Sequence, residues 1–187
     1  MFHKKVITVP SIILLVSTSA FAAMNYQAAK PPNDSQEVSA LLSDAKTEAI
    51  QLRDDADQLK AFTHSSLRWQ THASKVEEIK EHVNNSGKLL TRLERAEESA
   101  SAWQRQAIDR IRPLLEELAS SVESTIDHLN QKPALLQTGP YADYAAANYD
   151  LASNLAGLIS DYVEYGKSKA KSEELGTKLE VTSEPRE

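Results

Sequence analysis

Apolar residues recur along most of the chain at spacings of three and four residues, the period of an amphipathic helix. In the first such region they form two heptad rows: Val38, Ala45, Leu52 and Leu59, and Leu42, Ala49 and Ala56. Both rows fall on one face of a helix with about 3.5 residues per turn, as in coiled coils and bundles. Asp34, with Glu37 three residues later, resembles a helix-capping pair. The pattern predicts a helix from Asp34 to about Phe62.

A second region follows the polar stretch 63–66, which predicts a turn. Its two rows are Phe62, Trp69, Val76, Val83 and Leu90, and Ser65, His72, Ile79, Ser86 and Leu93. Residues 84–87 (Asn-Asn-Ser-Gly) are poor helix formers. Because the heptad phase continues through them, they predict a local irregularity and not a chain reversal.

Two more helices are predicted in the second half of the chain. Ser101 and Gln104 have the spacing of a capping box, so the third helix is expected to start there. Its rows are Ile108, Leu115, Val122 and Leu129, and Ile111, Leu118 and Thr125, with Pro113 on neither row and hence on the outer face. Pro140 suits the first position of the fourth helix. Its rows are Tyr144, Leu151, Leu158 and Tyr165, and Tyr141, Asn148, Leu155 and Tyr162, with Ala145, Ala152 and Ile159 widening the stripe.

Four long helices joined by short links predict an all-α, antiparallel up-down-up-down four-helix bundle over residues 34–172. A polar, partly disordered tail is expected over 173–187. A three-helix arrangement with one very long helix is the alternative. The up-down order would bring Trp69 near Tyr141 or Tyr144, and Trp103 near Tyr162 or Tyr165.

The first 22 residues have the pattern of a secretion signal. A basic start (His3, Lys4 and Lys5) precedes a mostly apolar stretch from Val6 to Val16, and Ala20-Phe21-Ala22 is a small-x-small cleavage pattern. We therefore expect a signal peptide over 1–22, a flexible leader over 23–33 and a periplasmic or extracellular protein. A retained membrane anchor is the alternative, although the apolar stretch is short for one.

Composition narrows the classes of function. The 187 residues include no cysteine, which excludes disulfides, thiolate catalysis and cysteine-ligated zinc. Without residues 1–22 the chain has 19 basic and 27 acidic residues, a net charge of −8. An acidic surface repels phosphate backbones, so nucleic acid is not an expected partner. Stable membrane insertion after signal cleavage is not expected either.

Catalytic and cofactor motifs are missing from the sequence. No histidine has a glutamate three residues before it, as the di-iron bundles require, and no His-x-x-x-His occurs. Phosphate-binding glycine loops and nucleophile elbows are absent as well. We therefore expect no enzyme activity, no cofactor and no metal site.

Three polar residues interrupt the apolar rows: His72, Thr125 and Asn148. In an up-down bundle they fall at similar depth from one end, so they could form one interior polar layer. Such a layer is either a device that fixes helix register or a small ligand site with a titratable imidazole. The first expectation for function is an exported, non-enzymatic bundle that acts through contacts with a protein partner or with itself in the cell envelope. The alternative is a bundle that binds or senses a small ligand at this layer.

Overall fold

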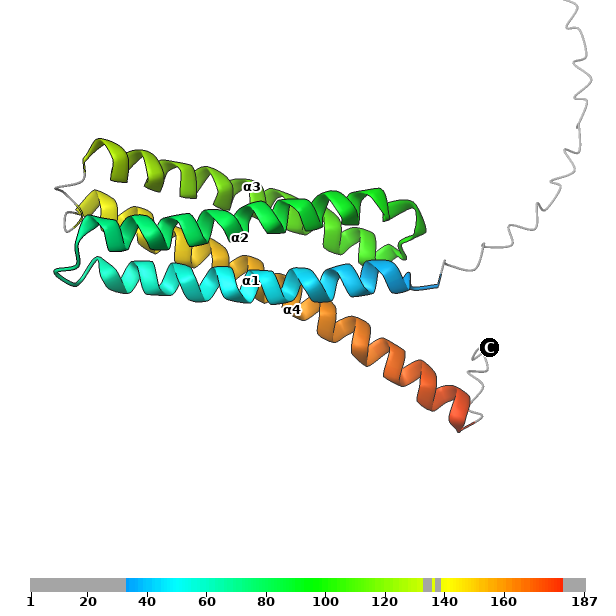
Figure 1. The fold of residues 1–187 in the computed structure, drawn as a ribbon. Helices are drawn as coiled ribbons and strands as arrows, with labels where there is room; N and C mark the ends of the chain where they lie inside the picture. The colour runs from blue at the N-terminus through cyan, green and yellow to red at the C-terminus, as the bar shows by residue number, and fades with distance from the viewer. Residues whose placement is uncertain (1–32, 133–135, 137–138, 180–187) are drawn as a thin grey trace, which may run out of the picture. The chain divides into compact units, whose positions relative to one another are not determined.

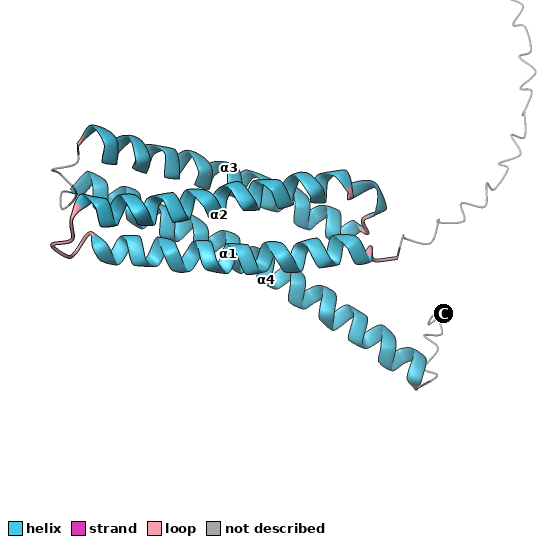
Figure 2. Cartoon of the chain, in the orientation of Figure 1, coloured by secondary structure: helices cyan, strands magenta, loops and turns pink. Residues whose placement is uncertain are grey.

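The computed structural model of the chain describes residues 33–132, 136 and 139–179. The predicted signal peptide and the leader up to residue 32 lie outside this part. Within it the chain is helical and contains no strand (Figure 2). The elements are α1 (Gln36–Phe62), α2 (Trp69–Arg95), a short 3-10 helix η1 (Glu97–Ser99), α3 (Ala102–Gln131) and α4 (Gly139–Lys178).

The four long helices form a bundle in which each packs against two others. α1 lies between α2 and α4, and α3 packs on the other side of the same two helices. The C-terminal part of α4 continues past the other three helices and diverges from them (Figure 1). None of the described helices is long and apolar enough to cross a membrane.

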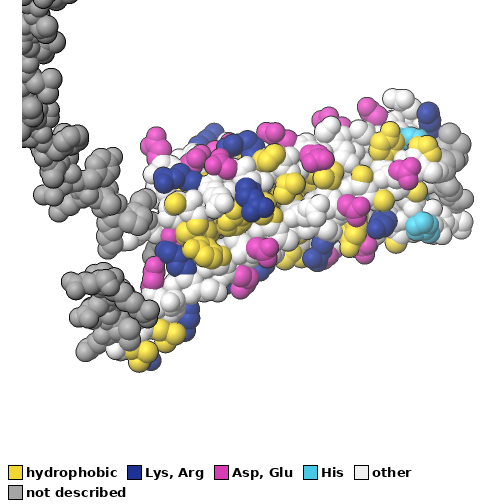
Figure 3. All heavy atoms as spheres, turned by 180° about the vertical axis from the view of Figure 1, so that it is seen from behind, with side chains coloured by type: hydrophobic (Ala, Val, Ile, Leu, Met, Phe, Trp, Pro, Cys, Tyr) yellow, Lys and Arg dark blue, Asp and Glu magenta, His cyan; other side chains and the backbone are white. Residues whose placement is uncertain are grey.

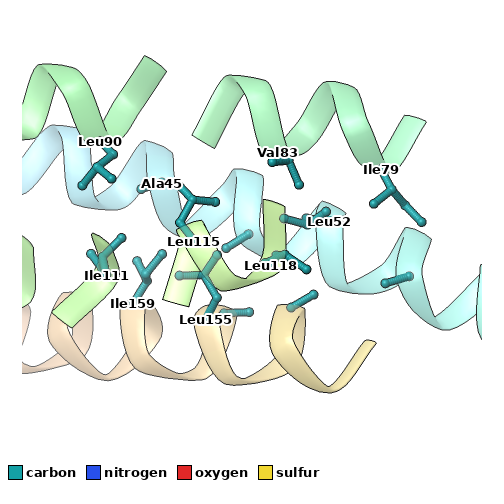
Figure 4. Packing of buried hydrophobic residues seen from close by; sticks show 14 of the residues in the cluster. Ala45, Leu52, Ile79, Val83, Leu90, Ile111, Leu115, Leu118, Leu155 and Ile159 are labelled. Carbon is teal, nitrogen blue, oxygen red and sulfur yellow. The ribbon is translucent and has the colours of Figure 1, made fainter. Parts of the chain in front are cut away.

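The heptad rows of α1, α2 and α3 supply most of the core, as predicted, but Trp69 at the start of α2 is 46% exposed. Leu52, Ile79 and Leu118 are fully buried, each from a different helix, and Leu155 of α4 completes the same interior (Figure 4). Burial of such side chains is the main favourable contribution to folding, at about 25 cal/mol per Å² of apolar surface. α2 also runs through residues 84–87 without a break, and Pro113 lies on the exposed side of α3.

α4 buries most of one of its two predicted heptad rows and leaves the other at the rim of the bundle. Tyr144 and Tyr165 of that row are 37% and 53% exposed. The fully buried positions are Tyr141, Asn148 and Leu155, together with Ala145, Ala152 and Ile159, which had been expected only to widen the stripe. The small side chains of Ala145 and Ala152 let α4 approach its neighbours closely. The bulkier row is therefore turned toward the rim of the bundle.

The other differences between the predicted and the observed helices lie at the helix ends. Ser35, and not Asp34, caps α1: its hydroxyl accepts the Val38 N–H at 3.4 Å. α2 starts at Trp69, so Ser65 precedes the helix. α4 continues to Lys178, so residues 173–178, which were assigned to the tail, are helical. Residues 180–187 lie outside the described part.

Candidate functional site

A groove of about 510 Å³ runs between α3 and α4. Its lining residues are Trp103, Gln106 and Arg110 from α3, and Leu158, Asp161, Tyr162 and Tyr165 from α4. On each helix these positions are three or four residues apart, so each set forms a single face. We call this surface the α3–α4 groove.

Trp103 is held in place at the groove by groups from two parts of the chain, the residue Asp34 before α1 and the middle of α4. Its indole Nε1 donates to Asp34 Oδ1 at 2.7 Å, and its ring meets the Tyr165 ring edge-on with centroids 5.4 Å apart. A Cβ atom at Gly166 would lie 2.8 Å from the indole, so only glycine leaves room for it. The contact with Tyr165 confirms the predicted proximity of Trp103 to that end of α4.

Asp34 connects the start of α1 to both walls of the groove. Its second carboxylate oxygen accepts from Lys169 Nζ of α4 at 2.8 Å. Partial burial alone would raise the pKa of Asp34, but hydrogen bonds from Lys169 and Trp103 hold this pKa below its ordinary value. The carboxylate is thus ionised at neutral pH and bridges α1, α3 and α4.

The groove carries two charged side chains, Arg110 and Asp161. The Arg110 guanidinium lies 5.9 Å from the centre of the Tyr162 ring, and its Nη1 is 3.5 Å from the Tyr162 hydroxyl. Among the described residues no carboxylate forms an ion pair with Arg110, and no cation forms one with Asp161. Seen from behind, hydrophobic side chains gather near the end from which α4 projects, with basic side chains beside them (Figure 3).

Gln104 lies beneath this surface and joins the first turns of two helices. Its Oε1 accepts the backbone N–H groups of Ser35 and Ser101, both at 2.9 Å. Its Nε2 donates to the Ser35 carbonyl at 2.8 Å and to Ser39 Oγ at 2.9 Å. The bond to Ser101 confirms the predicted capping role of Gln104 in α3. The bonds to α1, 69 residues away, were not predicted.

The three interior polar residues are all fully buried. Asn148 Nδ2 donates to Thr125 Oγ1 at 2.8 Å, and that hydroxyl donates to the Ser121 carbonyl at 2.9 Å. The structure thus brings Thr125 and Asn148 together. His72 instead has its Nδ1 3.2 Å from the Tyr141 hydroxyl.

Tyr141 and His128 are members of this interior cluster that the sequence analysis did not single out. The Tyr141 ring lies 5.4 Å from the His72 ring and 5.8 Å from the His128 ring. Tyr141 shares a heptad row with Asn148, and this spacing was the available signal. Three buried polar atoms of this cluster have no hydrogen-bond partner among the described residues: His72 Nε2, His128 Nε2 and Asn148 Oδ1.

Burial of His72 predicts a dependence of stability on pH. Because the interior disfavours the imidazolium, the pKa of His72 is lowered from 6.5. Below about pH 6.5 the unfolded chain then binds more protons than the folded one, so stability falls as the pH falls. One group contributes at most about 1.4 kcal/mol per pH unit. Urea unfolding from pH 7.5 to 5 should show a smaller loss for His72→Gln than for the wild type, and equal losses would contradict this role.

A second histidine cluster lies at the surface between α1 and α2. His82 Nδ1 is 2.7 Å from Glu48 Oε1, and its Nε2 is 3.2 Å from Asp55 Oδ2. The two carboxylates meet opposite edges of one ring, so they do not converge on a common point. In the described part of the chain no three histidine or acidic side chains are placed to hold a metal ion. This cluster joins the two helices through contacts between one imidazole and two carboxylates.

Comparison with known proteins adds no family to this description. No protein-family model, no curated protein and no solved structure matches the chain. The function is therefore argued from the groove and the interior cluster.

Proposed function

We propose that this chain is an exported, non-enzymatic bundle protein that acts through protein–protein contacts in the cell envelope, and that the α3–α4 groove is its contact surface. The observation that carries the proposal is the composition of the groove. Tryptophan, tyrosine and arginine are the residue types that contribute most to binding at protein interfaces. Trp103, Tyr162, Tyr165 and Arg110 line this one groove together.

The rigidity of the groove supports the same function. Trp103 is fixed by Asp34 and fits against Gly166, so its ring does not have to be ordered on binding. A pre-positioned aromatic side chain costs less conformational entropy when a partner docks. Arg110 and Asp161, which form no ion pair with any described residue, would then select among partners by charge complementarity.

We also propose that neighbouring helices of the bundle alternate in direction and that the protein is exported. Helices that alternate in direction are supported by the pairing of Trp103 with Tyr165 and of His72 with Tyr141. Export is supported by the basic and apolar pattern of residues 1–22. In this scheme the bundle works outside the cytoplasm after signal cleavage.

A second candidate function is a small-ligand-binding or sensor bundle that uses the interior polar cluster. It is favoured by the three buried polar atoms of this cluster that have no partner in the described part of the chain, because such atoms cost stability unless a water or a ligand satisfies them. Native mass spectrometry of the purified protein tests it. A small molecule that stays bound in the wild type and is lost from Asn148→Leu would favour this candidate.

A photo-crosslinking amino acid at Gln106 tests the contact surface in living cells. Gln106 lines the groove and is exposed, so a photoreactive side chain there should capture a docked protein. The same residue at Glu77, exposed on α2, is the matched control. We expect an adduct from position 106 that the Tyr165→Ala variant loses, and none from position 77. Adducts from neither position, or equal adducts from both, would contradict the groove as contact surface.

A further inference from the structure

α4 carries a heptad row that its own bundle buries only in part: Leu151 and Leu158 pack against the edge of the core, while Tyr144 and Tyr165 are exposed. The row Tyr144, Leu151, Leu158 and Tyr165 lies at the rim, and counting on in sevens extends it to Ser172 and Leu179. Tyr165 is 53% exposed and Leu179 is 66% exposed. A helix with one row in a core and a second row outside it has a surface for another helix.

The projecting end of α4 also lacks packing within the chain. From Ala170 to Lys178 every side chain is exposed apart from half-buried Gly176, and Leu175 is 42% exposed. Helical segments of this length are marginal in water unless they pack against something. The end of α4 nevertheless continues as helix beyond the other three helices (Figure 1).

We infer that a second copy of this chain covers this row, with the two α4 helices packed antiparallel about a two-fold axis between Ser168 and Lys169. The inference rests on the proposed function and names its partner. In such an arrangement the projecting end of each α4 lies along the α3–α4 groove of the other copy. Every contact forms twice, as in other isologous dimers.

The spacing of the row fits this pairing. With the axis between Ser168 and Lys169, Leu158 faces Leu179 of the second copy, and Tyr165 faces Ser172 of the second copy. Tyr162, which lines the groove, faces Leu175 of the second copy. Each tyrosine or leucine of one copy thus faces a leucine or the small serine of the other copy. Such pairing of large with smaller side chains allows helices to pack closely. The contact extends over 22 residues of each chain, from Leu158 to Leu179 just past the end of α4, about 33 Å at 1.5 Å per residue.

Charge complementarity favours the same register. Arg110, beside Tyr162, has no carboxylate partner among the described residues. Glu173 of the second copy comes level with Glu164, within one turn of Tyr162. Lys46 and Lys167 already neutralise Glu164 within the chain, so Glu173 can meet the Arg110 guanidinium. Lys171 of the second copy comes within one turn of Glu164. Both ion pairs would flank the apolar row, as charged positions flank the core of a coiled coil.

The oligomeric state of the exported protein, purified in the form that the cell produces, tests the inference. Analytical ultracentrifugation should give twice the mass of one chain. Leu179→Lys should weaken the dimer by about tenfold or more, because it places a charge opposite Leu158. Thr177→Lys is the matched control: it adds the same charge on the opposite face of the exposed end of α4 and should leave the dimer intact. A monomeric wild type, or equal effects of the two variants, would overturn the inference.

Disulfide trapping tests the register, since the chain has no cysteine of its own. Ser168→Cys places two thiols on either side of the two-fold axis and should give a crosslinked dimer on mild oxidation. Leu179→Cys should not, because in antiparallel helices the two copies of that position are about 30 Å apart. Crosslinking through Leu179→Cys in place of Ser168→Cys would mean a parallel pairing and would refute the proposed register.

The photo-crosslink at position 106 separates the two proposals. An adduct with twice the mass of the chain supports both of them. An adduct with a different protein from a monomeric chain leaves the groove as the contact surface and overturns the second copy as its occupant. No adduct at all contradicts the proposed function itself.

Discussion

Replacing Gln104 by leucine should lower the free energy of unfolding by about 3–5 kcal/mol. The buried amide makes four hydrogen bonds, two of them to backbone N–H groups at the starts of α1 and α3. Leucine has a similar volume but accepts none of them. The N–H groups of Ser35 and Ser101 would lose their acceptor, and each buried donor without one costs about 1–3 kcal/mol.

Urea or thermal unfolding followed by circular dichroism measures this loss. Gln106→Leu is the matched control, because Gln106 is the same residue type two positions along the same helix and is exposed. Its effect should stay within about 0.5 kcal/mol. If both variants lost the same amount, the bonds from Gln104 to the two helix starts would not explain its contribution.

The helices and most of the core could be predicted from the sequence because the relevant information is local. In α1, the spacing of Val38, Leu52 and Leu59 marks one face, and only that face can bury enough apolar surface. Residues 84–87 are also helical despite their low helix propensity, because the apolar positions on either side of them stay on one face of α2. Tertiary packing supplies more helix stability than propensity does.

The orientation of α4 could not be predicted in the same way. Its sequence offers two adjacent apolar faces, one with tyrosines and leucines and one with Ala145 and Ala152. Which face turns inward depends on how closely α1 and α3 approach, and therefore on residues of other helices. The structure selects the alanine face. The row left outside is the surface from which self-association is inferred.

The groove is also a product of tertiary contacts. Gly166 marks the point in the sequence where α4 becomes strongly polar, but its structural role is to admit the indole of Trp103. Asp34 was predicted to be a cap and instead accepts from Trp103 and Lys169, 69 and 135 residues away. No pattern within one helix indicates such pairs. The sequence could indicate the aromatic residues but not the groove that they line.

The sequence shows the interior polar residues as interruptions of apolar rows, but it indicates only some of their hydrogen-bond partners. Thr125 and Asn148 interrupt rows on consecutive helices at matching depth, and they are bonded. His72 was expected in the same layer and bonds to Tyr141. A tyrosine on an apolar row reads as a core aromatic, so its hydroxyl was not counted as a polar group of the interior.

Asn148→Asp should lower the free energy of unfolding by about 3–5 kcal/mol at pH 7, because it places a carboxylate in the core with no cation to pair with it. Asn148 is fully buried, and its one hydrogen bond in the described structure is a donation to Thr125. Burial raises the pKa of the new carboxyl above that of the unfolded chain. The deficit should therefore shrink as the pH is lowered from the raised pKa of the folded state toward about 4, the ordinary pKa of an aspartate in the unfolded chain.

Asn148→Leu is the matched variant for this position. Thr125 keeps its bond to the Ser121 carbonyl when the amide is removed, so no donor is left without an acceptor. The variant should therefore unfold within about 1 kcal/mol of the wild type. Urea unfolding of both variants at pH 7 and pH 4.5 measures the difference. A deficit for Asn148→Asp that is small and independent of pH would show that water reaches this position, and the interior cluster would then be open enough to admit a small ligand.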